Sequence, residues 1–251
     1  MNDILNTFHL DEGNIKLYYE DGYLQIPDLI NKSFIEELRN EVLHIMDTIG
    51  LVNSKLRQTT QYLKGSMLDS LVNSYKLKEL AGKLMNGESS LYMPFTAVKS
   101  ENGGGKFHFH QDNQYTEFDK PGTNFWFALN KMTLNNGCLQ IDPKSHLNGT
   151  LESEPSGDGD QHKKVKLEPE NFKALLMNPG DCVAFSRLTI HGSGPNNSNE
   201  PRIAYAIQFH RDDAKAKWGG NDWVLLKKNP RWSIAPVNKI VPPEEVSLDG
   251  H

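Results

Sequence analysis

The chain carries the tripeptide His110-Gln111-Asp112 and, 79 positions after Asp112 (191 − 112 = 79), His191. Two imidazoles and one carboxylate that leave the opposite face open suit a non-haem ferrous ion, which must also bind a cosubstrate and dioxygen. A structural zinc site would usually close its fourth position with Cys. His110 and Asp112 leave the same face if they lie on one strand. His191 must then come from a facing strand, which a rolled sheet supplies more readily than a flat one.

Short β-rich runs follow one another from Ser90 onward and alternate with turn residues. The runs cover 91–99, 107–115, 123–130, 137–142, 172–178, 182–187 and 202–210. Short strands at this spacing indicate a sandwich or jelly roll rather than a parallel α/β sheet. We therefore expect a mainly β protein.

Two helices are expected before these strands. Ser33-Phe34-Ile35-Glu36 has the capping-box pattern, and apolar residues follow at helical spacing. The second helix should run from Met67 to Met85 and end at Asn86-Gly87. We expect both helices to cover one face of the sheet.

The length of 251 residues fits a single domain, because all-β domains often reach this size. We divide it into a helical part at 1–89, a β core at 90–211 and a C-terminal extension or lid at 212–251. The net charge of −5, from 27 basic and 32 acidic residues, is scattered and gives no case for nucleic acid.

Membrane and export features are missing from the sequence pattern. No apolar run approaches the roughly 20 residues that span a bilayer, and the first residues lack the pattern of a secretion signal. Cys138 and Cys182 lie in apolar, strand-like segments and are expected to be buried thiols of a reduced compartment. These observations predict a cytoplasmic protein.

Arg202 opens the strand-like run that ends at Phe209. A planar guanidinium held on a strand suits the distal carboxylate of a dicarboxylic acid. Together with the candidate metal ligands, it predicts an oxygenase that depends on iron and 2-oxoglutarate.

Several segments, taken in order, resemble the phytanoyl-CoA dioxygenase family. They are His-Gln-Asp-Asn at 110–113, Trp-Phe-Ala-Leu at 126–129, Asn-Asn-Gly-Cys-Leu at 135–139, Pro-Lys-Ser-His at 143–146, Pro-Gly-Asp at 179–181, His-Gly-Ser-Gly-Pro-Asn at 191–196 and Arg202. The resemblance covers roughly residues 91–210. Pro-Lys-Ser-His replaces the more usual Pro-Gly-Ser-His, and Phe109 stands where Trp is often found. Neither change touches a ligand.

The resemblance implies a double-stranded β-helix (jelly-roll) core with flanking N-terminal α-helices. It also implies that His110, Asp112 and His191 hold Fe(II), and that dioxygen is split while 2-oxoglutarate becomes succinate and carbon dioxide. Halogenating relatives replace the carboxylate with a small residue. Asp112 is present here, which favours hydroxylation of a C–H bond, or another oxidation, over halogenation.

The same resemblance assigns the cosubstrate residues. Arg202 would bind the far carboxylate of 2-oxoglutarate, Ser193 would add a hydroxyl to it, and Trp126 would form a wall beside it. A further polar contact is expected from the strand at 95–99, where Thr96 and Lys99 remain open.

The expected partner is a small-molecule substrate of unknown identity. Polar candidate lining residues favour a small polar compound over a fatty acyl chain; they are His108, Gln111, Asn113, Tyr115, Asn124 and Arg187. The polar stretch at 149–170 and the glycine-containing stretch at 212–224 are candidate lids.

Two other classes stay open from the residues alone. A cupin-type metal enzyme would use His108, His110 and His191 without 2-oxoglutarate, although Glu117 is too far away for the usual cupin spacing. A non-catalytic β-sandwich binding module would keep the fold and bind no metal.

Overall fold

A computed structural model describes residues 3–50, 56–157, 162–167, 169, 171–218, 220, 222–228 and 234–242. The helices are α1 (Glu12–Asp21), α2 (Ile35–Thr48), α3 (Met67–Val72) and α4 (Tyr75–Met85). The strands are β1 (Tyr23–Ile26), β2 (Leu56–Arg57), β3 (Ser89–Lys99), β4 (Phe107–His110), β5 (Glu117–Phe118), β6 (Gly122–Ala128), β7 (Gln140–Ile141), β8 (Ser153–Pro155), β9 (Lys163–Val165), β10 (Lys173–Ala174), β11 (Cys182–Ser186), β12 (His191–Ser193), β13 (Arg202–Arg211), β14 (Lys215–Lys217) and β15 (Val224–Leu225).

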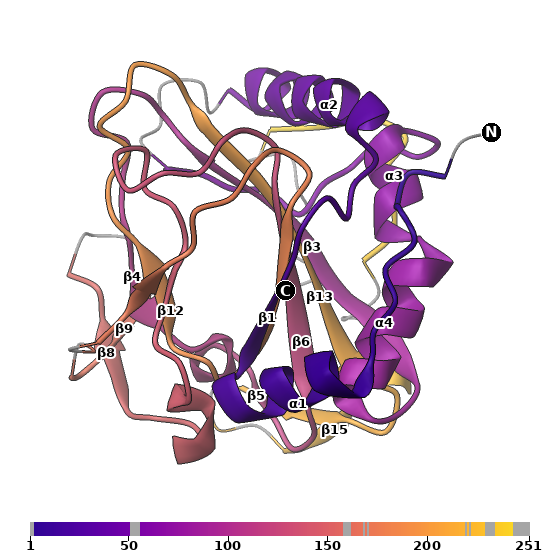
Figure 1. The fold of residues 1–251 in the computed structure, drawn as a ribbon, viewed down its shortest axis with the longest axis vertical. Coiled ribbons are helices and arrows are strands. Elements are labelled where there is room, and N and C mark those ends of the chain that lie inside the picture. Colours follow the sequence, from indigo (N-terminus) through magenta and orange to yellow (C-terminus); the bar gives the residue numbers. More distant parts are fainter. Residues whose placement is uncertain are drawn as a thin grey trace.

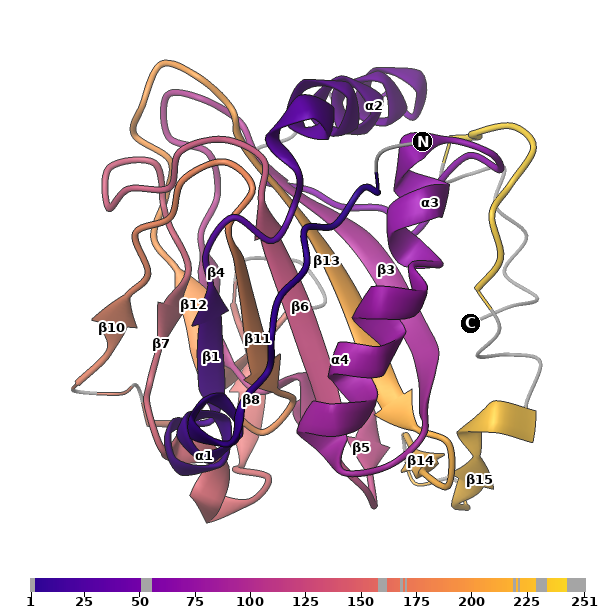
Figure 2. The same cartoon turned by 45° about the vertical axis from the view of Figure 1, so that its right-hand side comes forward.

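Two antiparallel sheets form the centre of the molecule. The larger has the strand order β1-β11-β6-β13-β3-β2, and the smaller has the order β10-β7-β12-β4. In Figures 1 and 2 the helices cover one side of the larger sheet, while β4, β7 and β12 lie on its other side. This arrangement confirms the predicted jelly-roll core with flanking helices.

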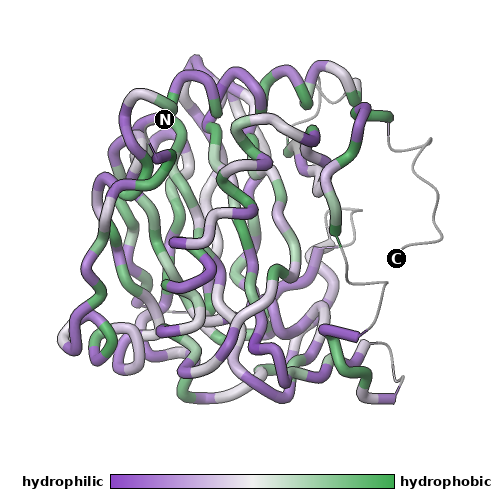
Figure 3. Tube along the Cα trace, turned by 90° about the vertical axis from the view of Figure 1, so that its right-hand side faces the viewer, coloured by the Kyte–Doolittle hydropathy of each residue, from purple (hydrophilic) through white to green (hydrophobic). Residues whose placement is uncertain are grey.

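Side-chain alternation along β13 separates two cores. Ile203, Tyr205 and Ile207 pack into the core between the helices and the larger sheet. Ala204 and Ala206 pack into the core between the two sheets. Because successive strand residues point to opposite faces, the even-numbered positions of β13 face the space between the sheets. Figure 3 shows hydrophobic stretches along the strands and hydrophilic loops at their ends.

The start of α2 differs from the predicted capping box. A short 3-10 turn (Lys32–Phe34) precedes the helix, and the Asn31 side chain accepts the Ser33 backbone N–H at 3.1 Å. No side chain caps α2 itself. The prediction was wrong because Asn31, two residues earlier, supplies an equally good cap.

The helix predicted over 67–85 is two helices. Asn73 ends α3, and its side-chain amide donates to Asp69 Oδ1 at 2.6 Å; Ser74 then caps α4. Such short polar side chains offer the backbone local alternatives to a continuous helix. The predicted end at Asn86 is confirmed, with this residue in the left-handed conformation.

The structure adds α1, which the sequence analysis did not predict. Asp11 and Asn14 form a capping box at its start, and Gly22 ends it at φ 82°. The Tyr18 hydroxyl donates to Thr123 Oγ1 on β6 at 3.0 Å, which ties the helix to the larger sheet.

The polar stretch at 149–170 contains the two-stranded hairpin of β8 and β9, while β14 and β15 join β5 in a small third sheet. No helix within the described ranges is long and apolar enough to cross a membrane.

Gly22 tests how tightly α1 is seated. A Cβ at this position would collide with His146 Nδ1 and Thr189 Oγ1, whereas Gly50, also at positive φ, has no described atom within 4 Å of its Cβ position. Gly50→Ala should lower the free energy of unfolding by about 1–2 kcal/mol, the cost of the left-handed conformation. Gly22→Ala should lose roughly 1–3 kcal/mol more through overpacking. Urea unfolding of both variants measures the difference; equal losses would contradict the close packing at Gly22.

Candidate active site

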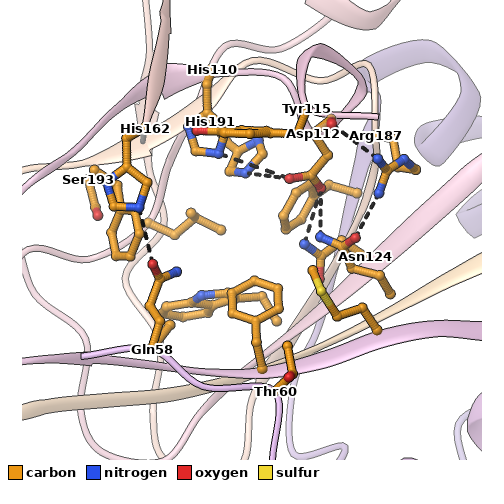
Figure 4. Close-up of a pocket in the computed structure, with 18 of the residues that line it drawn as sticks. Gln58, Thr60, His110, Asp112, Tyr115, Asn124, His162, Arg187, His191 and Ser193 are labelled. Atoms are coloured by element: carbon orange, nitrogen blue, oxygen red, sulfur yellow. Dashed lines mark hydrogen bonds and ion pairs between the residues drawn. The ribbon is translucent and has the colours of Figure 1, made fainter. Parts of the chain in front are cut away.

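Three side chains converge between the two sheets. His110 ends β4, His191 begins β12, and the two are paired in register. Asp112 Oδ1 lies 4.0 Å from His110 Nε2 and 3.8 Å from His191 Nε2. Figure 4 shows the three groups facing one point. Asp112 begins a 3-10 turn (Asp112–Gln114) instead of continuing the strand predicted over 107–115. His110 and Asp112 are therefore brought together by the end of β4 and the turn that follows it.

Both imidazoles are oriented by backbone carbonyls two residues earlier. His110 Nδ1 lies 2.7 Å from the His108 oxygen, and His191 Nδ1 lies 3.0 Å from the Thr189 oxygen. An Nδ1–H that donates to a carbonyl leaves the Nε2 lone pair for a metal. Burial, reinforced by His191, lowers the pKa of His110 to about 3, so this ring is the neutral form that binds metal.

The two oxygens of Asp112 have different partners. Oδ2 accepts from the side-chain amides of Asn124 at 3.3 Å and Gln208 at 3.2 Å. Oδ1 is left facing His110 and His191. The amides therefore fix the carboxylate with one oxygen directed at the metal position.

Arg187 holds the turn that carries Asp112 through hydrogen bonds. Its guanidinium donates to the Asp112 carbonyl at 3.0 Å, the Thr116 carbonyl at 3.1 Å and Gln208 Oε1 at 2.7 Å. Burial alone would raise the pKa of Asp112, but His191 and Arg187 hold it below its usual value. Asp112 is therefore an anion at neutral pH. The donor set of two imidazole nitrogens and one anionic oxygen fits a divalent ion with open coordination positions.

A cavity of about 700 Å³ opens beside this cluster. The described residues that line it come from both sheets, from 58–61 and from the β8–β9 hairpin; they are Gln58, Thr59, Thr60, Gln61, Tyr92, Met93, Phe95, Ala97, Phe107, His110, Asp112, Tyr115, Thr116, Asn124, Trp126, Leu139, His162, Phe185, Arg187, His191, Gly192, Ser193, Arg202 and Gln208.

Two buried cations lie side by side at one end of the site. Lys99 and Arg202 are register partners on β3 and β13, with exposed fractions of 0% and 1%. Lys99 Nζ donates to the backbone oxygens of Ser193 (3.3 Å) and Gly194. Arg202 Nη1 donates to the Ala97 oxygen at 3.0 Å, while its Nε has no partner.

Neither cation forms an ion pair with a carboxylate in the described part of the chain. Burial, and then Arg202, lowers the pKa of Lys99 to about 6, and burial lowers the pKa of Arg202 to about 9. Adjacent buried cations without an anion are unfavourable. The site therefore fits an anionic ligand such as the carboxylate of 2-oxoglutarate.

The structure distinguishes the two candidates left open on β3. Thr96 Oγ1 accepts the Thr59 backbone N–H at 3.0 Å and approaches Met46 on α2, so it lies on the helix side. Lys99 lies on the same face as Arg202. Ser193 and Trp126 line the cavity, and the Arg202 guanidinium lies 5.3 Å from the Trp126 ring centre.

Two predicted substrate residues hold the β8–β9 hairpin instead of lining the cavity. Gln111 Nε2 donates to the Gly149 oxygen at 2.9 Å, and Gln111 Oε1 accepts the Leu151 N–H at 2.7 Å. The Asn113 amide donates to Thr150 Oγ1 at 3.0 Å. These contacts fasten the hairpin to the turn that carries Asp112.

The remaining predicted substrate residues are divided. Tyr115, Asn124 and Arg187 line the cavity, although the Arg187 guanidinium is occupied by the contacts given above. His108 is not among the lining residues, and neither is any described residue of the candidate lid at 212–224.

Sequence reasoning missed Gln58, Thr60 and His162, which also line the cavity. Gln58 and Thr60 sit in a segment without a motif, and His162 sits in a polar insertion. Only the tertiary structure brings them near the metal ligands, so the sequence carried no signal for them.

Comparison with known proteins agrees with this geometry. The sequence matches the phytanoyl-CoA dioxygenase family over residues 18–204. The chain is 28% identical to "Methylphosphonate hydroxylase" of Gimesia maris, with 84% of this chain and 82% of that protein aligned. It is 30% identical to "Phytanoyl-CoA dioxygenase" of Arabidopsis thaliana, with 62% of this chain and 56% of that protein aligned.

Solved structures share the fold. EvdO2 from Micromonospora carbonacea, complexed with 2-oxoglutarate, superposes with a TM-score of 0.68 at 17% identity, covering 88% of this chain and 96% of that chain. The non-heme alpha ketoglutarate dependent epimerase SnoN gives 0.68 at 19% identity, covering 92% and 94%. The family match spans most of the chain and includes all three residues of the possible metal-binding cluster, His110, Asp112 and His191. The chain belongs to the phytanoyl-CoA dioxygenase family, and it is an oxygenase that uses iron, 2-oxoglutarate and dioxygen.

Proposed function

We propose that this oxygenase hydroxylates a C–H bond of a compact, polar small molecule and releases succinate and carbon dioxide. One observation carries the proposal. The open side of the metal-binding cluster and the guanidinium of Arg202 line the same cavity. A dicarboxylic keto acid that pairs with Arg202 at one end is thereby directed toward the metal position at the other.

The residues divide the work between binding and orientation. Iron, 2-oxoglutarate and dioxygen supply the oxidising chemistry when bound. Arg202 lines the cavity and binds the far carboxylate of the cosubstrate, and Ser193 lies beside it. Lys99, the neighbour of Arg202 on β3, is not among the lining residues and adds positive charge behind it. Trp126 keeps the cosubstrate against one wall and excludes water. His191 and Arg187 keep Asp112 ionised, and its amide donors orient it, so it balances part of the metal charge.

The size of the cavity supports a compact substrate. About 700 Å³ must accommodate both the cosubstrate and the substrate. This volume leaves little room for a bulky thioester group within the cavity. Methylphosphonate, which the name of the Gimesia maris relative gives as its substrate, is a suitable first compound to test.

The two other classes have less support. A cupin-type site needs His108, but the cluster of possible ligands among the described residues contains His110, Asp112 and His191. A metal-free binding module gives no reason for two imidazoles and a carboxylate to converge with their lone pairs facing one another.

Anaerobic titration tests the proposal directly. A weak visible charge-transfer band should appear only when ferrous iron and 2-oxoglutarate are both present. Succinate release should then rise above the rate with 2-oxoglutarate alone when a substrate is added. A protein that binds iron but gives no band with 2-oxoglutarate would refute the proposed function.

The metal ligands can be tested with a matched pair of histidine variants. His110→Ala should lose stoichiometric Fe(II), because one of three ligands is removed. His108→Ala should retain it, because the backbone oxygen of residue 108, and not its ring, orients His110. Iron content after anaerobic loading and desalting measures both. Loss of iron from the His108 variant alone would support the cupin alternative.

Arg202 can be tested through cosubstrate affinity. Leaving a buried carboxylate without its partner costs about 2–5 kcal/mol, so Arg202→Ala should weaken 2-oxoglutarate binding by roughly thirty- to several-thousand-fold. Arg202→Lys keeps the charge but loses the planar fork, so its Kd should fall between those of the wild type and the Ala variant. Iron binding should be unchanged. An Ala variant with wild-type cosubstrate Kd would remove Arg202 from the site.

Lys99 should make cosubstrate binding depend on pH. Its pKa of about 6 means that it is mostly neutral in the free enzyme at neutral pH. A bound carboxylate favours the charged amine and raises that pKa, so binding takes up a proton. The affinity should therefore fall as pH rises above about 6, by up to about tenfold per unit. Lys99→Met should bind weakly and lose this slope. Anaerobic Kd values across the range measure it; equal slopes in both proteins would contradict the assignment.

A further inference from the structure

The rim of the cavity opposite the metal ligands is a segment that β3 holds in place. The Thr59 N–H donates to Thr96 Oγ1 at 3.0 Å, and the Thr96 N–H donates to the Thr59 oxygen at 3.0 Å. Gln58 and Thr60, on either side of Thr59, line the cavity. The segment is therefore fixed, and its two polar side chains are available at the cavity wall.

His162 sets the orientation of Gln58. His162 Nε2 lies 3.1 Å from Gln58 Oε1, across a sequence separation of 104 residues. Figure 4 shows this contact at one side of the cavity. When Oε1 accepts from the imidazole, the amide nitrogen must point elsewhere. Within the described ranges, neither this nitrogen nor the Thr60 hydroxyl has a hydrogen-bond partner.

Asn124 adds a buried acceptor next to the metal ligands. It is only 1% exposed, its nitrogen is used by Asp112, and its Oδ1 has no partner. A buried polar atom without a partner destabilises the folded protein. The cavity that Asn124 lines gives a ligand access to supply the missing donor.

Among the described residues that line the cavity near Gln58 and Thr60, no cationic side chain has its terminal nitrogens free for a ligand. Arg187 is the one described lining residue here with a cationic side chain, and its terminal nitrogens are taken by Gln208 and two carbonyls. Lys163 does not line the cavity, and its Nζ donates to the Gln114 oxygen at 2.5 Å. A charged group placed against Gln58 and Thr60 would be desolvated without a counter-ion, which is strongly unfavourable.

We propose that Gln58, Thr60 and Asn124 form the substrate subsite, and that it takes an uncharged molecule with a carbonyl or hydroxyl group, such as an amide or an alcohol. The Gln58 amide nitrogen donates to the substrate oxygen, Thr60 adds a second contact, and Asn124 Oδ1 accepts a hydrogen from the substrate near the metal. His162 is a positioning residue that acts through Gln58. This assignment rests on the proposed function and goes beyond it by setting the charge of the substrate.

Compounds matched in shape and differing in charge test the substrate class. Isobutyramide, isobutanol, isobutyrate and methylphosphonate would be added to the anaerobic enzyme loaded with Fe(II) and 2-oxoglutarate. Perturbation of the charge-transfer band reports binding near the metal, and succinate release in air reports turnover. The amide or the alcohol should act at concentrations at least about tenfold below those of the two anions, a difference of about 1.4 kcal/mol.

Two results would overturn this class. In one, an anion binds more tightly than both uncharged compounds; in the other, neither uncharged compound changes the band or the rate. In both, the band with iron and 2-oxoglutarate still appears, so the proposed function stands. Absence of the band itself would refute the proposed function instead.

Variants test the residues with the better uncharged compound. Gln58→Leu and Thr60→Val should each raise its KM by about tenfold, the value of one lost hydrogen bond, with kcat, iron content and 2-oxoglutarate Kd unchanged. His162→Leu should raise KM in the same way, and His162→Gln, which keeps a donor, should restore it in part. Lys164→Leu, on the same hairpin but outside the cavity lining, is the control. Unchanged KM in the Gln58 and Thr60 variants would remove both from the subsite.

Discussion

The carboxylate of Asp112 is the group on which the arrangement of both sheets depends. A buried anion is tolerated only when its oxygens are paired. Asn124 on β6 and Gln208 on β13 satisfy one oxygen from the larger sheet, while His110 and His191 on the smaller sheet face the other. The separation of the two sheets at this point is therefore set by the reach of these five side chains. The same contacts keep the Asp112 carboxylate charged and directed at the candidate metal position.

The buried cations impose a second condition on the fold. Lys99 and Arg202 lie side by side without an anion among the residues that the structure describes. Placing them there opposes folding, because burial removes water from both groups and lowers the pKa of each. A dicarboxylate that binds only the native state offsets this cost by mass action. The proposed cosubstrate site thus combines lower local stability with affinity for an anion.

The cluster of His110, Asp112 and His191 was predictable because each residue lies in a short motif with an apolar strand beside it. The fold class was predictable for a related reason, since β-rich runs recur at short intervals. The choice between Thr96 and Lys99 was not, because strand alternation separates two faces without saying which one faces inward. The helix boundaries near Asn31 and Ser74 were missed because several neighbouring polar residues offer similar caps.

The residues of the proposed substrate subsite lay beyond sequence reasoning for a physical reason. Gln58 and His162 acquire their roles only through a contact between segments 104 residues apart. Gln111 shows the reverse case, because its position between two metal ligands suggested a substrate contact. The buried amide of Gln111 needs hydrogen-bond partners, and the backbone of Gly149 and Leu151 supplies them.

These hydrogen bonds connect the β8–β9 hairpin rigidly to the turn that carries Asp112. Gln111 and Asn113 bind residues 149–151 before β8, and the Lys163 N–H on β9 donates to the Tyr115 hydroxyl at 2.9 Å. His162 precedes Lys163 in the chain. A series of hydrogen bonds through Tyr115 therefore connects His162 to the turn that carries Asp112. A displacement of the hairpin would shift the Gln58 contact and the Asp112 turn together. For a substrate held in the proposed subsite, the fold would thereby fix the distance between its polar group and the metal, which is the condition for oxidising one C–H bond and not its neighbour.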